Sequence, residues 1–230
     1  MNTLPSSAPS PYNSEFFNEH RDGAHSSAAV IVPLILELVA PGRVIDVGCG
    51  TGTWTRVFRE LGCEVIGVDG AYVPREKLEI PSDLFIERDL VHPLDLSGAW
   101  DLAVSLEVAE HLPPSSAALF AEGLAGLAPV LLFSAAIPNQ GGLQHLNEQW
   151  PTYWIEHFRR AGMVPVDCIR PVIWEDLRVD WWYAQNTLVF VSESLLPRYP
   201  TLKRLQEASD GRVLPLVHPR LYASRVPPLS

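Results

Sequence analysis

A stretch of glycines near residue 50 carries residue types that are well placed to do chemistry. The apolar segment that ends at Val47 contains Asp46 and runs into Gly48, Gly50 and Gly52. Glycines at a junction between a strand and a helix let the backbone turn tightly and let a ligand approach the main chain. A carboxylate beside them would repel an anionic ligand and attract a cationic one. The spacing therefore predicts a small-ligand site with Asp46 near positive charge on the ligand.

Two kinds of fold place a glycine loop after the first strand, and the spacing separates them. Dinucleotide-binding folds use G-x-G-x-x-G, with the pyrophosphate at the N-terminus of the helix. Here the third glycine comes one position early, and Thr53 stands where that pattern requires glycine. An NAD-dependent oxidoreductase is therefore the weaker interpretation of this loop.

Asp46, Gly48, Gly50 and Gly52 match the motif [D/E]-x-G-x-G-x-G, and here the sequence resembles the class I S-adenosylmethionine-dependent methyltransferases. The resemblance covers roughly residues 40–136 and, more loosely, residues 14–191. It implies a Rossmann-like α/β fold, S-adenosyl-L-methionine as the cofactor, and a cofactor site that includes these four residues.

Three further segments at the family's spacing extend the resemblance. It implies that Asp69, at the end of the second apolar run, binds the ribose hydroxyls, which suits a carboxylate able to accept two hydrogen bonds. Asp89 and Leu90 follow the third run, where the family places groups near the adenine. Leu106 and Glu107 begin the segment LEVAEHL, which the resemblance places beside the methionine end of the cofactor.

Methyl transfer to a hydroxyl benefits from a base that titrates near neutral pH, which favours histidine. Two of the seven histidines, His111 and His145, follow apolar runs and should fall at the carboxyl edge of a parallel sheet. We expect His145 to be the general base, with Glu148 orienting it and His111 as a second catalytic candidate. The alternatives are that His111 only positions its loop and that Asn147 only caps the following helix.

Neither the histidines nor the cysteines show the spacing of a metal site. A site made by His111, His145 and Glu148 has no ligand signature, so no metal is predicted. The three cysteines have no C-x-x-C spacing, which favours reduced thiols over a disulfide framework or a zinc site.

The elements that must position these residues alternate along the chain. After a flexible, proline-rich arm over 1–13, a helix is predicted over 14–40, with a kink or a new helix at Pro33. The patterns predict strands over 43–47, 64–68, 84–87, 100–106, 130–135 and 187–191, and helices over 53–61, 115–127 and 152–161. This alternation indicates βαβ units.

Together with the resemblance, the alternation predicts a seven-stranded, mostly parallel sheet flanked by helices, with an N-terminal helical extension. The S-adenosylmethionine-dependent methyltransferase domain is expected over 14–191. Residues 192–230 contain six prolines and are expected to form an irregular C-terminal extension.

Composition narrows the classes of partner. The formal net charge of −10 disfavours nucleic acid and anionic membranes. The longest apolar run, 28–40, is 13 residues long and falls short of the about 20 residues that a membrane span needs. No signal peptide is visible, so we expect a cytoplasmic protein. Five of the seven tryptophans follow residue 149, which suits an aromatic wall over an acceptor, core packing, or subunit contact in a homodimer.

The sequence therefore predicts methyl transfer from S-adenosylmethionine to a small-molecule acceptor, at a hydroxyl of a sugar or secondary metabolite. The H-x-N-E-Q-W stretch that begins at His145 resembles a subgroup found in glycan and natural-product pathways. The alternatives are an N-methyltransferase or a non-methylating enzyme that uses the same cofactor. An oxidoreductase and a non-catalytic binding subunit are disfavoured.

Overall fold

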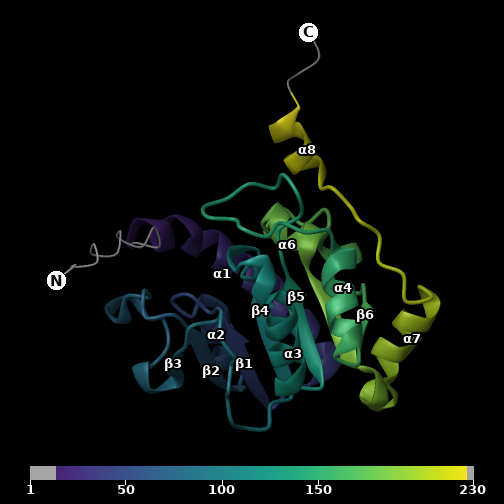
Figure 1. Cartoon of the computed structure of the whole chain (residues 1–230), viewed down its shortest axis with the longest axis horizontal. Coiled ribbons are helices and arrows are strands. Elements are labelled where there is room, and N and C mark those ends of the chain that lie inside the picture. The colour runs from purple at the N-terminus through teal and green to yellow at the C-terminus, as the bar shows by residue number, and fades with distance from the viewer. Residues whose placement is uncertain (1–13, 227–230) are drawn as a thin grey trace, which may run out of the picture.

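The computed structural model describes residues 14–226 and contains one seven-stranded sheet (Figure 1). The strand order is β3-β2-β1-β4-β5-β7-β6, and all neighbours are parallel except β7, which runs antiparallel to β5 and β6. This confirms the mostly parallel sheet. The strands are β1 (Arg43–Val47), β2 (Glu64–Asp69), β3 (Phe85–Glu87), β4 (Leu102–Leu106), β5 (Val130–Ser134), β6 (Met163–Val166) and β7 (Leu188–Ser192).

Helices cover both faces of the sheet, because successive side chains of each strand point to opposite sides. On β1, Val44 belongs to a core packed against α1 (Ser14–Val39) and α2 (Thr53–Glu60). The next residue, Ile45, belongs to a second core packed against α3 (Ala117–Leu127) and α4 (Pro151–Arg160). All three cysteines are buried free thiols, as the sequence predicts.

The sequence prediction missed strand β6 and left two possibilities open at Pro33. Strand β6 contains Pro165, which lacks an N–H group and argues against a central strand. β6 is the edge strand of the sheet, where an unpaired position is tolerated. Pro33 lies inside α1, which continues through it as one helix, so the prediction of a new helix there is wrong and the kink stays a prediction.

The C-terminal extension is not irregular, which corrects the expectation from its six prolines. It contains α7 (Pro200–Ala208) and α8 (Pro219–Arg225), and a proline stands at the start of each. Proline fits the first turn of a helix because the N–H group it lacks has no partner there. The chain runs from α7 at one side of the sheet to α8 at the top of the view (Figure 1), after the short helices α5 (Arg170–Ile173) and α6 (Trp181–Asn186).

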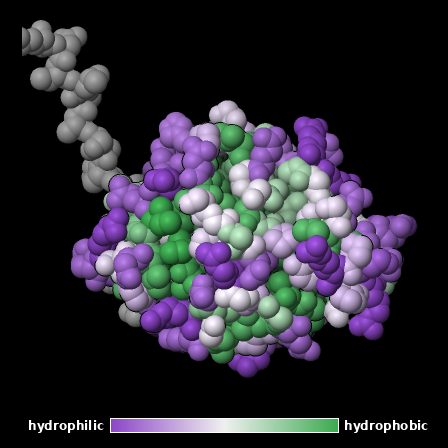
Figure 2. All heavy atoms as spheres, turned by 90° about the horizontal axis from the view of Figure 1, so that it is seen from below, coloured by the Kyte–Doolittle hydropathy of each residue, from purple (hydrophilic) through white to green (hydrophobic). Residues whose placement is uncertain are grey.

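By length and hydropathy alone, residues 22–39 of α1 could cross a membrane, although the longest uninterrupted apolar run has only 13 residues. In this fold 28% of that window is buried, and Ile31 and Ile35 are fully inside the first core. On the face of the molecule seen in Figure 2, hydrophobic side chains form several separate areas interrupted by hydrophilic ones. That the protein does not contact a membrane and that it forms a homodimer both remain predictions. The arm over 1–13 lies outside the described residues.

Candidate functional site

The glycine loop joins β1 to α2 in a backbone conformation that favours glycine. Gly48, Gly50 and Gly52 have φ values of 84°, 56° and 88°. A Cβ atom at Gly48 would lie 2.3 Å from a methyl carbon of Val108. The loop therefore packs its backbone against the segment after β4, and a side chain at position 48 would push the two apart.

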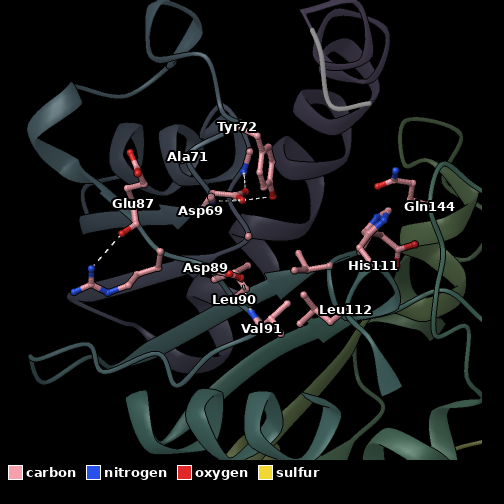
Figure 3. A pocket seen from close by; sticks show the side chains of 16 residues that line it. Asp69, Ala71, Tyr72, Glu87, Asp89, Leu90, Val91, His111, Leu112 and Gln144 are labelled. Carbon is pink, nitrogen blue, oxygen red and sulfur yellow. Dashed lines mark hydrogen bonds between the residues drawn. The ribbon is translucent and has the colours of Figure 1, made fainter. Parts of the chain in front are cut away.

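A cavity of about 640 Å³ opens beside this loop, at the carboxyl ends of β1, β2 and β4. In Figure 3, Glu87 and Asp89 lie on the opposite side of the cavity from His111 and Gln144. The lining residues are Gly48, Gly50, Asp69, Gly70, Ala71, Tyr72, Glu87, Arg88, Asp89, Leu90, Val91, Glu107, Val108, His111, Leu112 and Gln144.

Asp69 ends β2 and faces the cavity, where the resemblance places the ribose. Its Oδ2 accepts a hydrogen bond from Gly50 N at 2.6 Å, and its Oδ1 accepts one from Gly70 N at 2.7 Å. The Tyr72 hydroxyl also donates to Oδ1 (Figure 3). Burial raises the pKa of Asp69, and these three hydrogen bonds oppose the rise. The carboxylate thus ties the glycine loop to the end of β2.

Three other residues predicted to bind the cofactor do not line the cavity. Asp46 does not line the cavity; its Oδ2 accepts a hydrogen bond from Thr55 Oγ1 of α2 at 2.6 Å. Gly52 lies against Ile80, and Leu106 is the buried last residue of β4; neither lines the cavity. Asp46 therefore secures α2 beneath the loop, and its place beside a cationic ligand stays a prediction.

Burial raises the pKa of Asp46 to about 7, and nearby Asp69 adds to this. In the unfolded chain this carboxyl ionises near pH 4. Between about pH 4 and pH 7 the folded state therefore holds a proton that the unfolded state has lost, and stability falls as the pH rises through this window. Replacing Asp46 by Asn removes the charge and keeps an oxygen for Thr55.

We expect Asp46→Asn to raise the free energy of unfolding at about pH 8 by on the order of 4 kcal/mol, a gain that shrinks as the pH falls toward about 4. Urea denaturation of the wild type and of Asp46→Asn across this pH range measures the difference in the free energy of unfolding. The contributions of the other carboxylates are shared by both proteins and cancel in this difference. Parallel pH profiles for the two proteins would contradict it.

Asp89 and Leu90 line the end of the cavity that the resemblance assigns to adenine. The Oδ1 atom of Asp89 accepts a hydrogen bond from Val91 N at 3.1 Å, which closes a local turn. Leu90 is buried and lines the cavity. Asp89 is thus both a turn residue and a wall residue, and its other oxygen, Oδ2, lies 3.7 Å from His92 Nε2.

Glu107 is held firmly at the other end of the cavity. Its backbone has a φ of 53°, an uncommon conformation for a residue with a side chain. Its carboxylate accepts hydrogen bonds from Gln140 Nε2 at 2.9 Å and from Asn186 Nδ2 at 3.0 Å. Burial raises its pKa, while the bonds from Asn186, Ser134 and Gln140 oppose the rise. This network joins segments that are far apart in the sequence.

Only one of the two candidate histidines borders the cavity. His111 lines it, and burial together with the nearby His145 lowers the pKa of His111 to about 4. His145 does not line the cavity; its ring meets that of His111 edge-on with centroids 4.8 Å apart. Its Nδ1 lies 2.8 Å from Glu148 Oε1, which is the orienting contact expected from the sequence.

Glu110 lies beside the two histidines and was not selected as a site residue. Its side chain is fully buried, and burial, followed by the charge of Glu107, raises its pKa well above the usual range. Its backbone carbonyl accepts hydrogen bonds from Leu146 N at 2.7 Å and Asn147 N at 2.9 Å. These bonds bring the loop after β5 against the segment after β4. We call Glu110, His111 and His145 the Glu–His–His cluster.

The structure does not support two of the alternatives that the sequence left open for the segments after β5. Asn147 is buried and does not cap α4, whose N-cap residue is Trp150. None of the tryptophans lines the cavity, and Trp154 is buried in the second core. The aromatic wall is therefore absent from this cavity, among the residues that the structure describes.

Sequence reasoning missed Tyr72 and Glu110. Tyr72 follows Asp69 by three residues, a spacing that allows its hydroxyl to reach back to the carboxylate, but nothing in the pattern singled it out. Glu110 stands in the LEVAEHL segment, and a charged residue in an otherwise apolar stretch was a usable signal.

A family model described as a methyltransferase domain matches residues 17–169. A ubiquinone biosynthesis O-methyltransferase from Rhodopseudomonas palustris is 32% identical over 119 residues, which are 48% of this chain and 42% of that protein. One from Nitrosococcus oceani is 33% identical over 98 residues, 36% of this chain and 41% of that protein. The matches therefore span less than half the length of these relatives.

A solved structure shows the same fold. Magnesium protoporphyrin IX methyltransferase from Synechocystis, with bound SAH, superposes with a TM-score of 0.58 at 20% identity, over 80% of this chain and 96% of that chain.

Proposed function

The chain belongs to the methyltransferase family whose domain model matches residues 17–169, and on this premise we propose that it methylates a hydroxyl group of a small molecule with S-adenosylmethionine as donor. The observation that carries the proposal is the cavity, which has acidic residues along it and His111 at one end, with the ring of His145 packed against that of His111. The names of the O-methyltransferase relatives support the choice of oxygen.

The residues present fit S-adenosylmethionine. The glycines of the loop that borders the cavity have positive φ values and no Cβ atom, so a ligand can approach the backbone there. Asp69 would hold the ribose, Asp89 would lie at the adenine, and Glu107 would lie at the methionine end, where its charge suits a cationic ligand. When bound, the cofactor supplies a methyl group on a positively charged sulfur.

The acceptor would approach from the end of the cavity where His111 and Gln144 lie, opposite Asp89 (Figure 3). Methyl transfer requires the acceptor oxygen to lose its proton and to meet the methyl carbon in line with the bond that breaks. Transfer would form the carbon–oxygen bond as the carbon–sulfur bond breaks, with the electron pair of the broken bond left on sulfur. The acceptor proton would pass to His145, the base that the sequence predicts, and from there to solvent. The Glu–His–His cluster lies at the end of the cavity from which the acceptor would approach.

The sequence-based assignment of His145 as the residue that activates the hydroxyl leads to a prediction. We expect His145→Ala to lower turnover by about 100-fold or more, while the affinity for S-adenosylmethionine is unchanged because His145 does not line the cavity. Steady-state kinetics and calorimetric titration measure the two quantities. His25→Ala, at an exposed position on α1, is the matched control. Full activity of His145→Ala would remove it from the mechanism.

The function itself is tested by methyl transfer from labelled S-adenosylmethionine to a panel of phenols, sugar hydroxyls and amines. We expect label on hydroxylated acceptors, and the panel decides between a sugar and a secondary metabolite. Label on amines alone would favour the N-methyltransferase alternative. Cofactor binding with no transfer to any acceptor would contradict the proposal.

A further inference from the structure

Three potential metal ligands from two separate segments meet next to the cavity. A carboxylate oxygen of Glu110 and one ring nitrogen each of His111 and His145 all lie within 4.8 Å of one another. Two imidazole nitrogens and one carboxylate oxygen are a donor set that proteins use for divalent metals. We propose that the Glu–His–His cluster binds a divalent first-row transition metal ion.

The buried carboxylate of Glu110 points to a cation. The side chain has no exposed surface, and among the described residues neither carboxylate oxygen has a hydrogen-bond partner. Burying a carboxylate without a partner is costly, so such groups in proteins take up a proton, are paired or bind metals. A cation between Glu110 and the two histidines would supply the missing partner.

The loop after β5 holds His145 as metal-binding histidines are held. Glu148 accepts hydrogen bonds from Asn139 N and Gly141 N, both at 2.7 Å, and from His145 Nδ1 at 2.8 Å. A carboxylate on one ring nitrogen fixes the tautomer and leaves the lone pair on the other nitrogen, Nε2. This carboxylate–histidine pair is the usual support of a metal ligand.

The loop also makes room for this imidazole. A Cβ atom at Gly142 would lie 2.2 Å from His145 Nε2, so the ring occupies space that any other residue at position 142 would fill. The two hydrogen bonds from Leu146 N and Asn147 N to the carbonyl of Glu110 fix the loop against the other two ligands. The geometry of the cluster is therefore set by the backbone of both segments.

The donor set indicates which metals would bind. Imidazole nitrogens favour Zn²⁺, Co²⁺ and Fe²⁺ over Mg²⁺ and Ca²⁺, which prefer oxygen ligands. Three protein ligands leave coordination positions open, and His111 borders the cavity. On the proposed function, the acceptor hydroxyl would take an open position and lose its proton to solvent more readily. His145 would then act as a ligand rather than as the general base.

Metal binding is measured without any methyl acceptor. Tag-free protein is stripped with a chelator, dialysed and titrated with Co²⁺, whose visible absorption reports imidazole ligation, with Zn²⁺ and Mg²⁺ as competitors. We expect one Co²⁺ per chain, displaced by Zn²⁺ and not by Mg²⁺. His145→Ala and Glu110→Gln should weaken Co²⁺ binding by at least about 100-fold, and His25→Ala should leave it unchanged. Circular dichroism and titration with S-adenosylmethionine check that each variant is folded.

Absence of stoichiometric Co²⁺ binding to the wild type, or equal binding by all variants, would overturn the proposal. Failure of the metal site and failure of the proposed function give different results. Full transfer to a hydroxyl acceptor in excess chelator, with no Co²⁺ binding, would refute the metal site and leave the function standing. Co²⁺ binding that depends on the cluster, without transfer to any hydroxyl, would support the metal site and refute the function.

Discussion

Asp69→Ala is expected to reduce the affinity for S-adenosylmethionine by at least about 100-fold. The carboxylate accepts hydrogen bonds from Gly50 N and Gly70 N and lies on the wall of the cavity. Its removal deletes the acceptor for the ribose hydroxyls and leaves two backbone donors of the site without a partner. Hydrogen bonds to a charged group contribute about 1.5–3 kcal/mol each, and 1.4 kcal/mol is a tenfold change in affinity.

Calorimetric titration of S-adenosylmethionine measures the effect of this substitution. Asp83→Ala removes an exposed aspartate that does not line the cavity, and it should bind like the wild type. Asp69→Asn keeps one acceptor oxygen and should fall between the two. An unchanged affinity in Asp69→Ala, in a protein whose circular dichroism is that of the wild type, would refute the assignment of the cofactor site.

Gly48→Ala is expected to destabilise the fold by about 3 kcal/mol or more. Two separate costs add together. The backbone at this position has a φ of 84°, which costs an L-residue with a Cβ atom about 1 kcal/mol. The new methyl group would lie 2.3 Å from one methyl carbon of Val108 and 2.6 Å from the other, so the loop and the segment after β4 must separate.

The chain supplies a matched control for the backbone cost. Gly62 has a φ of 97°, and a Cβ atom there would meet nothing within 4 Å. Gly62→Ala should therefore cost only about 1 kcal/mol, and the difference between the two variants gives the steric cost. Urea denaturation measures both. Adding Val108→Ala to Gly48→Ala should recover part of the loss in a double-mutant cycle. Equal destabilisation by Gly48→Ala and Gly62→Ala would show that the contact with Val108 does not matter.

Local features of the sequence determined most of the sheet and one side of the site. Each of the strands over 43–47, 64–69 and 130–134 is a short apolar run bounded by turn residues, so its position depends on neighbours in the chain. The glycine loop belongs to this class, because the positive φ values of Gly48, Gly50 and Gly52 need residues of one type at fixed places. Asp69 and Asp89 were identified because the family resemblance places an acidic residue at or just after the second and third runs, and both line the cavity.

Features that depend on packing between distant segments were misjudged. No strand was predicted over 163–166, a segment that contains Pro165, and only the strand order shows that β6 is at the edge, where a proline is tolerated. Asp46 stands at the end of a strand like the other candidates, yet its side chain turns toward Thr55 of α2 and away from the cavity. Which way a side chain points at a strand end depends on the layer packed against it.

The Glu–His–His cluster is the clearest example of a feature that depends on packing between distant segments. Glu110 and His145 are 35 residues apart, and no spacing rule connects them. Their meeting depends on two hydrogen bonds from the loop after β5 to the carbonyl of Glu110, and on the space left by Gly142. The sequence by itself determined the glycine loop and the acidic strand ends, because these follow from local backbone conformation. Only the tertiary structure decided which charges are buried together, because burial and distance between remote segments arise when the layers pack.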